Sequence, residues 1–181
     1  MARLAASLLV LVVTASILVT AALANPTEPR AFSRAERTGD WPAHGPGSPG
    51  DPVQVSRRVA QYVDGRGRST ELFVAKTRQR VCIMLVSRSA AGGGCNPLRV
   101  GLFPRGTKLA ITSGKHIAGI ATDDVKRVVL IGIRGRRHAA RLSPDNAFIY
   151  DCKAWNGCPG LVATINAYDG HGKLIDRVAG P

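Results

Sequence analysis

The sequence predicts a mainly β protein: a small antiparallel sandwich or partly open barrel of about eight or nine short strands, preceded by one short helix. After Gly67, short β-prone segments alternate with Gly, Pro, Asn and Asp residues at intervals of roughly 8 to 12 residues. The clearest hairpin is the last one, where Asp169-Gly170-His171-Gly172 joins two apolar segments. Four cysteines in the same part of the chain can cross-link a small fold of this kind.

Residues 1–24 have the organisation of a secretory signal peptide. Arg3 gives a short positive region, an apolar run extends from Leu4 to Ala22, and Ala22-Leu23-Ala24 is a small-x-small processing pattern. We therefore expect cleavage before Asn25. The alternative is an uncleaved anchor, because an apolar run of about 20 residues can cross a hydrocarbon core as a helix. The sequence thus predicts export, with membrane contact only through an uncleaved leader.

Residues 25–50 predict a disordered spacer, because they hold five prolines, several glycines and no apolar period. The remainder, residues 51–181, has the usual size of one domain and predicts a single disulfide-stapled β domain. Its first residues predict the short helix, with Asp51 as N-cap, Pro52 at the first helical position and Gly65 as the stop. The expected apolar face of that helix holds Val55, Val59 and Tyr62.

Nine strands follow the helix in this prediction. Val125–Ile133 has apolar residues on both faces, which is typical of a central strand covered on each side. Asp123-Asp124 and Asp145-Asn146 are expected in turns between strands. The expected strands are Glu71–Lys76, Arg80–Val86, Lys108–Thr112, His116–Ala121, Lys126–Ile133, His138–Leu142, Ala147–Tyr150, Leu161–Ala167 and Lys173–Val178.

The four cysteines form an even set, which in an exported protein indicates disulfide bonds. Three connectivities are possible. Proximity favours Cys82 with Cys95 and Cys152 with Cys158, because each pair closes a short loop around turn-forming residues, Ala90 to Gly94 in the first loop. A metal site is the alternative, but the chain has no Cys-x-x-Cys pair and its histidines are scattered. The sequence therefore predicts no metal and no cofactor.

Four segments follow one another along the chain: a valine-rich strand with a cysteine, a glycine-rich loop ending in a second cysteine, a segment with adjacent aspartates, and an Asn-x-Phe element. They are Arg80–Val86, Ala90–Cys95, Ile117–Val128 and Asn146–Phe148. In these segments the chain resembles uncharacterised exported β-rich proteins of high-GC Gram-positive bacteria. The resemblance implies a β fold and export, and it carries no established activity. The chain departs from that pattern in its second cysteine pair and its arginine density.

The chain is strongly basic. It has 25 Lys and Arg against 12 Asp and Glu, a net charge of +13, and loss of the leader removes only Arg3. A net charge of this size affects which partners the protein attracts and how soluble it is, and it says nothing about the fold. Arginines that merely solvate the surface are one interpretation, and attraction to an anionic cell-envelope polymer is the other. The composition argues against nucleic acid as a partner, because base stacking needs aromatic side chains and only 5% of the residues are aromatic.

Two surface elements are candidate binding sites. The densest basic element comprises Arg134, Arg136, Arg137, His138 and Arg141. It is either a solvated turn or a loop that binds phosphate, sulfate or carboxylate groups through its arginines. Because alternate residues of a strand share a face, Arg137 and Arg141 point away from Arg136. Trp155, between Cys152 and Cys158, either anchors a partner or covers the end of the sandwich.

No catalytic motif stands out in the sequence. The Gly-x-Ser-x-Gly, His-Glu-x-x-His and Gly-x-x-x-x-Gly-Lys patterns are all missing. We therefore expect an exported, non-enzymatic binding or surface-associated domain that contacts an anionic envelope polymer or a protein partner. The alternative is a secreted hydrolase whose residues meet only in the fold. A concave pocket with two or more titratable groups of perturbed pKa would favour the hydrolase.

Overall fold

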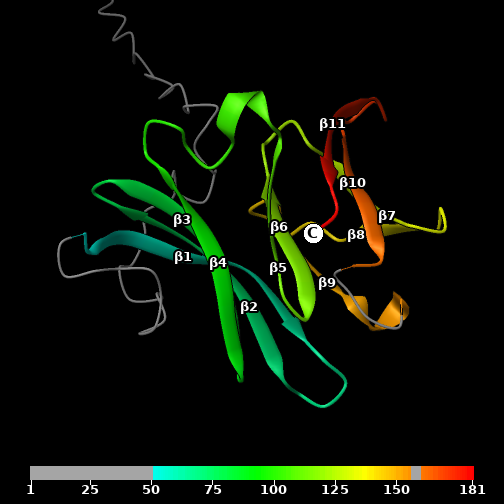
Figure 1. Cartoon of the computed structure of the whole chain (residues 1–181), viewed down its shortest axis with the longest axis horizontal. Helices are drawn as coiled ribbons and strands as arrows, with labels where there is room; N and C mark the ends of the chain where they lie inside the picture. Colours follow the sequence, from blue (N-terminus) through cyan, green and yellow to red (C-terminus); the bar gives the residue numbers. More distant parts are fainter. Residues whose placement is uncertain (1–50, 156–159) are drawn as a thin grey trace, which may run out of the picture.

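The structure, a computed structural model, describes residues 51–155 and 160–181. Its eleven strands form three antiparallel sheets, which lie side by side in Figure 1. The first sheet comprises β1 (Val53–Val63), β2 (Ser69–Thr77), β3 (Arg80–Ser87) and β4 (Ala90–Pro97), in that order. The middle sheet has the order β5 (Leu109–Ser113), β6 (His116–Ala121) and β9 (Ala147–Asp151). The last sheet has the order β11 (Leu174–Ala179), β10 (Val162–Tyr168), β7 (Arg127–Gly132) and β8 (Arg137–Ala140).

The predicted mainly β class is confirmed, and all nine expected strands are present. Two short 3-10 elements lie between strands: η2 (Pro104–Gly106) between β4 and β5, and η3 (Cys152–Trp155) between β9 and β10. The sheets formed by the described residues do not close into a barrel. The turns predicted at Asp123-Asp124 and Asp145-Asn146 are confirmed, as is the β10–β11 hairpin, in which Asp169 accepts hydrogen bonds from the His171 and Lys173 N–H groups.

The middle sheet is buried on both faces, because alternate side chains of its strands enter different cores. On β6, Ile117 packs in the core shared with the last sheet, and Ile120 packs in the core shared with the first. Both side chains are fully buried. The three sheets therefore stack as layers. The core toward the first sheet includes Leu72, Val74, Ile83, Ala118, Ile120 and Ala147, and the core toward the last sheet includes Ile117, Phe148, Val128, Leu130 and Ile165.

The doubly covered strand is β6, whereas the sequence predicted it at Val125–Ile133. Within its sheet β7 is central, since it pairs with β10 on one side and β8 on the other. Only one of its faces is fully buried, however: Val128 and Leu130 are inaccessible, whereas Val129 and Ile131 on the other face are half-buried. Apolar residues on both faces of a strand thus do not require two covering layers, because exposed apolar side chains are common on protein surfaces.

The helix predicted from Asp51 is wrong: these residues form β1, antiparallel to β2. A bulge between Arg58 and Ala60 shifts the register of this pair. It places the buried residues Ser56 and Val59 three positions apart, a spacing that resembles one helical turn. Asp51 caps a different element, the β2–β3 turn, where its carboxylate accepts hydrogen bonds from Thr77 Oγ1 (2.7 Å) and Arg80 Nε (3.1 Å).

The glycine-rich segment predicted as a loop is the edge strand β4, paired with β3 along its whole length. Glycine is depleted in strands, so its presence here hid the pairing. At Gly93 it is required, because a Cβ would lie 2.1 Å from the Ile83 carbonyl oxygen. Cys82 and Cys95 stand opposite each other in this pair and form a disulfide bond, as predicted.

Cys152 is disulfide-bonded as well, and its predicted partner Cys158 lies outside the described residues. Disulfide bonds favour an oxidising compartment for the folded protein. The predicted leader and spacer, residues 1–50, also lie outside the described part. Among the described residues, none forms a helix with the length and apolar character needed to cross a membrane.

Candidate functional site

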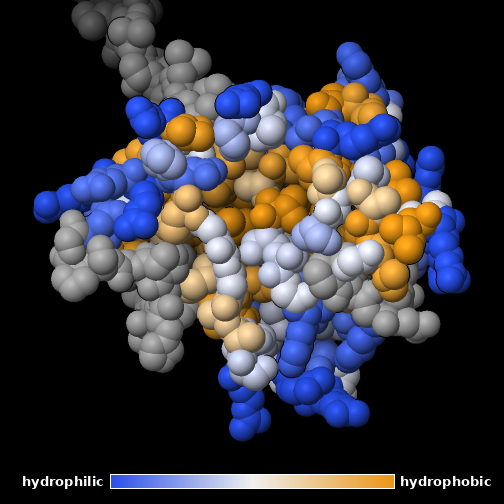
Figure 2. Space-filling model, in the orientation of Figure 1, coloured by the Kyte–Doolittle hydropathy of each residue, from blue (hydrophilic) through white to orange (hydrophobic). Residues whose placement is uncertain are grey.

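Several turns meet at one end of the fold around a cavity of about 460 Å³, which we call the His116 cavity. The connections β1–β2, β3–β4 and β5–β6 contribute to its lining, together with the end of β9 and the start of η3. Figure 1 shows the β1–β2 and β3–β4 turns at the lower end of the view, and Figure 2 shows hydrophilic residues gathered at that end. Its charged or titratable members are Asp64, Arg68, Arg88, Lys115, His116, Asp151 and Lys153.

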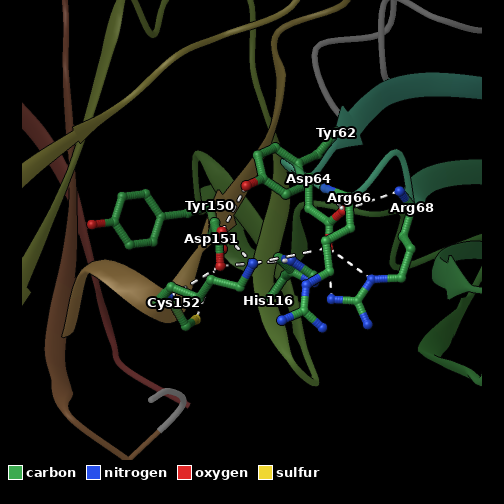
Figure 3. A network of polar contacts seen from close by, with 9 residues as sticks. Tyr62, Asp64, Arg66, Arg68, His116, Tyr150, Asp151 and Cys152 are labelled. Atoms are coloured by element: carbon green, nitrogen blue, oxygen red, sulfur yellow. Dashed lines mark hydrogen bonds and ion pairs between the residues drawn. The ribbon is translucent and has the colours of Figure 1, made fainter. Parts of the chain in front are cut away.

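Asp64 organises the β1–β2 turn. Its Oδ1 accepts hydrogen bonds from the backbone N–H groups of Arg66 (2.8 Å) and Arg68 (3.0 Å), and its Oδ2 lies 2.7 Å from Arg68 Nη2. The Arg68 backbone N–H, followed by the Arg68 side chain, holds the pKa of Asp64 well below its usual range. Asp64 is therefore ionised at neutral pH and fixes the Arg68 guanidinium beside the cavity, as Figure 3 shows.

Asp151 is the second carboxylate of the cavity. The Tyr62 hydroxyl donates a hydrogen bond of 2.6 Å to Asp151 Oδ2, which raises the pKa of Tyr62 to about 12 because the bond stabilises the neutral phenol (Figure 3). Burial acts to raise the pKa of Asp151, but hydrogen bonds from Tyr62 and the Lys153 N–H, with the nearby Lys153 ammonium, outweigh it and lower that pKa. Asp151 is thus ionised, and its carboxylate already accepts hydrogen bonds from Tyr62 and the Lys153 N–H.

His116 lies opposite Asp151 in the β6–β9 register. Its Nε2 is 3.9 Å from Asp151 Oδ1, and its ring lies 5.3 Å from the Tyr62 ring, centroid to centroid. Burial lowers the pKa of His116 below 6.5, and the nearby Lys153 and Lys115 act in the same direction, while Asp151 and Asp64 oppose them. The imidazole is therefore mostly neutral at pH 7 and becomes a cation only under more acidic conditions.

The cavity carries more cations than free carboxylates. Arg68 and Lys153 lie near Asp64 or Asp151, with Lys153 Nζ 3.9 Å from a carboxylate oxygen of each aspartate. Within the described ranges, the side chains of Arg88 and Lys115 pair with no carboxylate, and both residues are exposed. Such a surface attracts anions, because guanidinium and ammonium groups donate charge-assisted hydrogen bonds to phosphate, sulfate or carboxylate oxygens. The described residues contain no group of three His, Cys, Asp or Glu residues placed to hold a metal ion.

The arginines predicted as a binding element lie elsewhere, on the β7–β8 turn, on β8 and directly after β8. Arg134, Arg136, Arg137 and Arg141 are all exposed, and none of them lines the His116 cavity. The predicted alternation is confirmed for β8, where Arg137 is exposed, His138 is half-buried and Ala140 is buried. A role of these arginines in binding stays a prediction. Trp155 belongs to η3, but its side chain lies outside the described part of the chain.

Sequence reasoning did not identify the residues that form the cavity. Tyr62 and Asp151 are 89 residues apart, and they meet because the first and middle sheets pack together. The one feature of the sequence that could have pointed to these residues is their position near strand ends: β1 ends at Val63, β6 begins at His116 and β9 ends at Asp151. Strand ends gather at the edges of a layered fold, but the local pattern does not say which ends share an edge.

We expect stability to depend on His116 at mildly acidic pH. Because the pKa of His116 is lowered in the folded state, the unfolded chain binds the proton first, so the free energy of unfolding falls as the pH drops below about 6.5. The cavity carboxylates, whose pKa values are lowered from 3.8, titrate below this window. Urea unfolding at about pH 7.5 and at about pH 5.5 measures how far the free energy of unfolding falls between the two conditions. This decrease should be smaller for His116→Gln than for the unsubstituted protein.

The matched control for this measurement is His171→Gln, in the exposed β10–β11 turn. It should keep the pH dependence of the unsubstituted protein. An unchanged pH dependence in His116→Gln would show that burial of His116 does not oppose its protonation.

No protein-family model, curated protein or solved structure matches this chain.

Proposed function

We propose that this protein is an exported, non-enzymatic binding domain that holds anionic groups of a cell-envelope polymer in the His116 cavity. The observation that carries the proposal is the charge of this cavity: Arg68, Arg88, Lys115 and Lys153 line it, while both of its carboxylates already accept hydrogen bonds. Export is supported by the leader pattern of residues 1–24 and by the disulfide between Cys82 and Cys95. The excess of basic residues in the whole chain supports attraction of a polyanion over longer distances.

The cavity offers two kinds of cation for an anionic group. Arg68 is held by Asp64, so its guanidinium is oriented before the ligand arrives, which lowers the entropy cost of binding. Arg88 and Lys115 stand on neighbouring turns and keep their charges exposed to an incoming ligand. The ligand therefore replaces water on these two cations without having to displace a carboxylate.

We expect Lys115→Glu and Arg88→Glu each to weaken binding of tripolyphosphate by about tenfold or more, since each reversal replaces an attractive contact by a repulsive one. Isothermal titration calorimetry at low ionic strength measures the affinity. The matched control is Arg137→Glu, which makes the same change in net charge on β8, away from the cavity. Raising the salt to about 0.5 M should weaken binding to the unsubstituted protein, because exposed charges are screened.

Equal weakening by all three reversals would contradict binding in the cavity and point to attraction by overall charge. Loss of binding in Arg137→Glu alone would instead place the site on the arginine-rich β7–β8 turn. An affinity that does not change with salt would contradict the electrostatic basis of the proposal.

The second candidate is a hydrolase, favoured by the presence of Asp64, His116 and Asp151 in one cavity with shifted pKa values. A neutral imidazole beside a carboxylate can act as a general base. Against it, no described hydrogen bond joins His116 to a serine: Ser69 accepts one from Gln61, and Ser87 donates to the Ala90 carbonyl. Turnover of bis(p-nitrophenyl) phosphate or p-nitrophenyl acetate that disappears in His116→Gln would establish the hydrolase.

A further inference from the structure

A second hollow of about 440 Å³ adjoins the His116 cavity, and we call it the Arg66 hollow. The two share four lining residues, and the Arg66 hollow adds Arg66, Gly67, Glu71 and Val86 beyond them. Thr70 lines only the His116 cavity and its neighbour on β2, Glu71, lines only the Arg66 hollow, so the two hollows lie on opposite faces of this strand. They meet at the end of the first sheet, where the β1–β2 and β3–β4 turns form a common rim, and we call the two hollows with this rim the groove. The shared residues are Arg68, Ser69, Ser87 and Arg88.

Cations continue along the whole groove. Lys115 and Lys153 line only the His116 cavity, Arg68 and Arg88 lie at the shared boundary, and Arg66 lines only the Arg66 hollow. The carboxylate of the second hollow, Glu71, pairs with Arg58 at 2.8 Å, and among the described residues no carboxylate pairs with the Arg66 side chain.

The β1–β2 turn fixes the backbone from which two of these cations project. Asp64 accepts hydrogen bonds from the backbone N–H groups of both Arg66 and Arg68, and Gly67 between them has a φ of 74°, which favours glycine. Figure 3 shows the Arg66 and Arg68 side chains projecting to the same side of this turn. The turn therefore fixes the backbone positions of both arginines, and Asp64 also holds the Arg68 guanidinium.

We propose that the ligand of this groove is a linear polymer of repeated phosphate groups, which runs from the His116 cavity across Arg68 and Arg88 into the Arg66 hollow. The proposal rests on anion binding in the His116 cavity and deepens it. A single anion needs only one of the two hollows, whereas a row of cations through both matches a ligand with charge repeated along its length. Phosphate is the favoured group, because each guanidinium fork can bind two of its oxygens at once.

Two probes of different length test the proposal: tripolyphosphate, which fits one hollow, and a polyphosphate of about 15 units, which reaches through both. Lys115→Glu should weaken binding of both probes. Arg66→Glu should leave the affinity for tripolyphosphate within about twofold and weaken binding of the longer chain by about fivefold or more. Arg137→Glu is the control for net charge, and far-UV circular dichroism checks that each variant is folded.

Equal effects of Arg66→Glu on the two probes, or no effect on either, would overturn the extended groove and leave cavity binding intact. No effect of Lys115→Glu on either probe would overturn the proposed function itself. Oligogalacturonate of about the same length serves as a carboxylate polymer, and binding as tight as that of polyphosphate would contradict the preference for phosphate.

Discussion

Replacing Gly119 with valine should lower the free energy of unfolding by about 3 kcal/mol, because the side chain has no space in the middle sheet. A Cβ at Gly119 would lie 2.7 Å from Ile111 Cδ1, 2.8 Å from the Ala110 carbonyl oxygen and 2.9 Å from Phe148 Cε1. Real Cβ atoms do not approach so closely, so at least one neighbour must move. The backbone oxygen belongs to the adjacent strand β5, which cannot shift without disturbing its pairing with β6.

Gly114→Val is the matched control, in the β5–β6 turn of the same hairpin. A Cβ at Gly114 meets no atom within 4 Å, and its backbone lies outside the left-handed region. Urea unfolding should therefore show a large loss for Gly119→Val and a small one for Gly114→Val. Similar losses in the two variants would mean that the middle sheet accommodates a side chain at Gly119, and that its close packing is not what selects glycine there.

This crowding also bears on the candidate site. Gly119 lies on the strand that begins with His116, and burial of β6 on both faces gives that strand little freedom to move. His116 is therefore held by one of the best-packed elements of the fold, while Arg88 and Lys115 lie on exposed turns. The cavity combines a rigid floor with more accessible cations at its rim.

Local patterns in the sequence were sufficient for most strands, because alternation and turn residues act over a few positions. They failed at β1, where the bulge near Arg58 shifts the alternation by one residue and imitates a helical spacing. They failed at β4 for a different reason. Its glycines carry no side-chain pattern, so its pairing with β3 depends on the neighbouring strand and on the Cys82–Cys95 bond.

Stacking of the three layers could not be predicted, since it depends on which sheet covers which. β6 and β7 both have apolar residues on two faces, yet only β6 is covered on both. The same limit applies to the cavity. Asp64, Lys115 and Asp151 each lie at or just after an ordinary strand end, and only the packing of the first and middle sheets brings them to one edge.

Removing the disulfide bond between Cys82 and Cys95 should also have a large effect. The bond closes a loop with a sequence separation of 13, and a loop of this length contributes on the order of 3 kcal/mol by restricting the unfolded chain. Cys82 is fully buried, so alanine at both positions removes the cross-link and leaves a small vacancy in the first sheet. Urea unfolding of Cys82→Ala/Cys95→Ala against the unsubstituted protein measures the loss, and equal stability would contradict it.

The loss of stability on removing the disulfide bond should be concentrated at β4, because few other contacts hold this strand in place. It is an edge strand with five exposed residues at its start, three of them glycines, and among the described strands it pairs with β3 alone. Hydrogen exchange should therefore accelerate at Gly92, Gly94 and Asn96 in the double variant, while the amides of the β10–β11 hairpin keep their protection. Uniform acceleration would show that the bond stabilises the whole fold rather than its edge. Since β4 begins two residues after Arg88, loosening this strand should also weaken tripolyphosphate binding, which connects oxidation of the protein to the proposed function of its cavity.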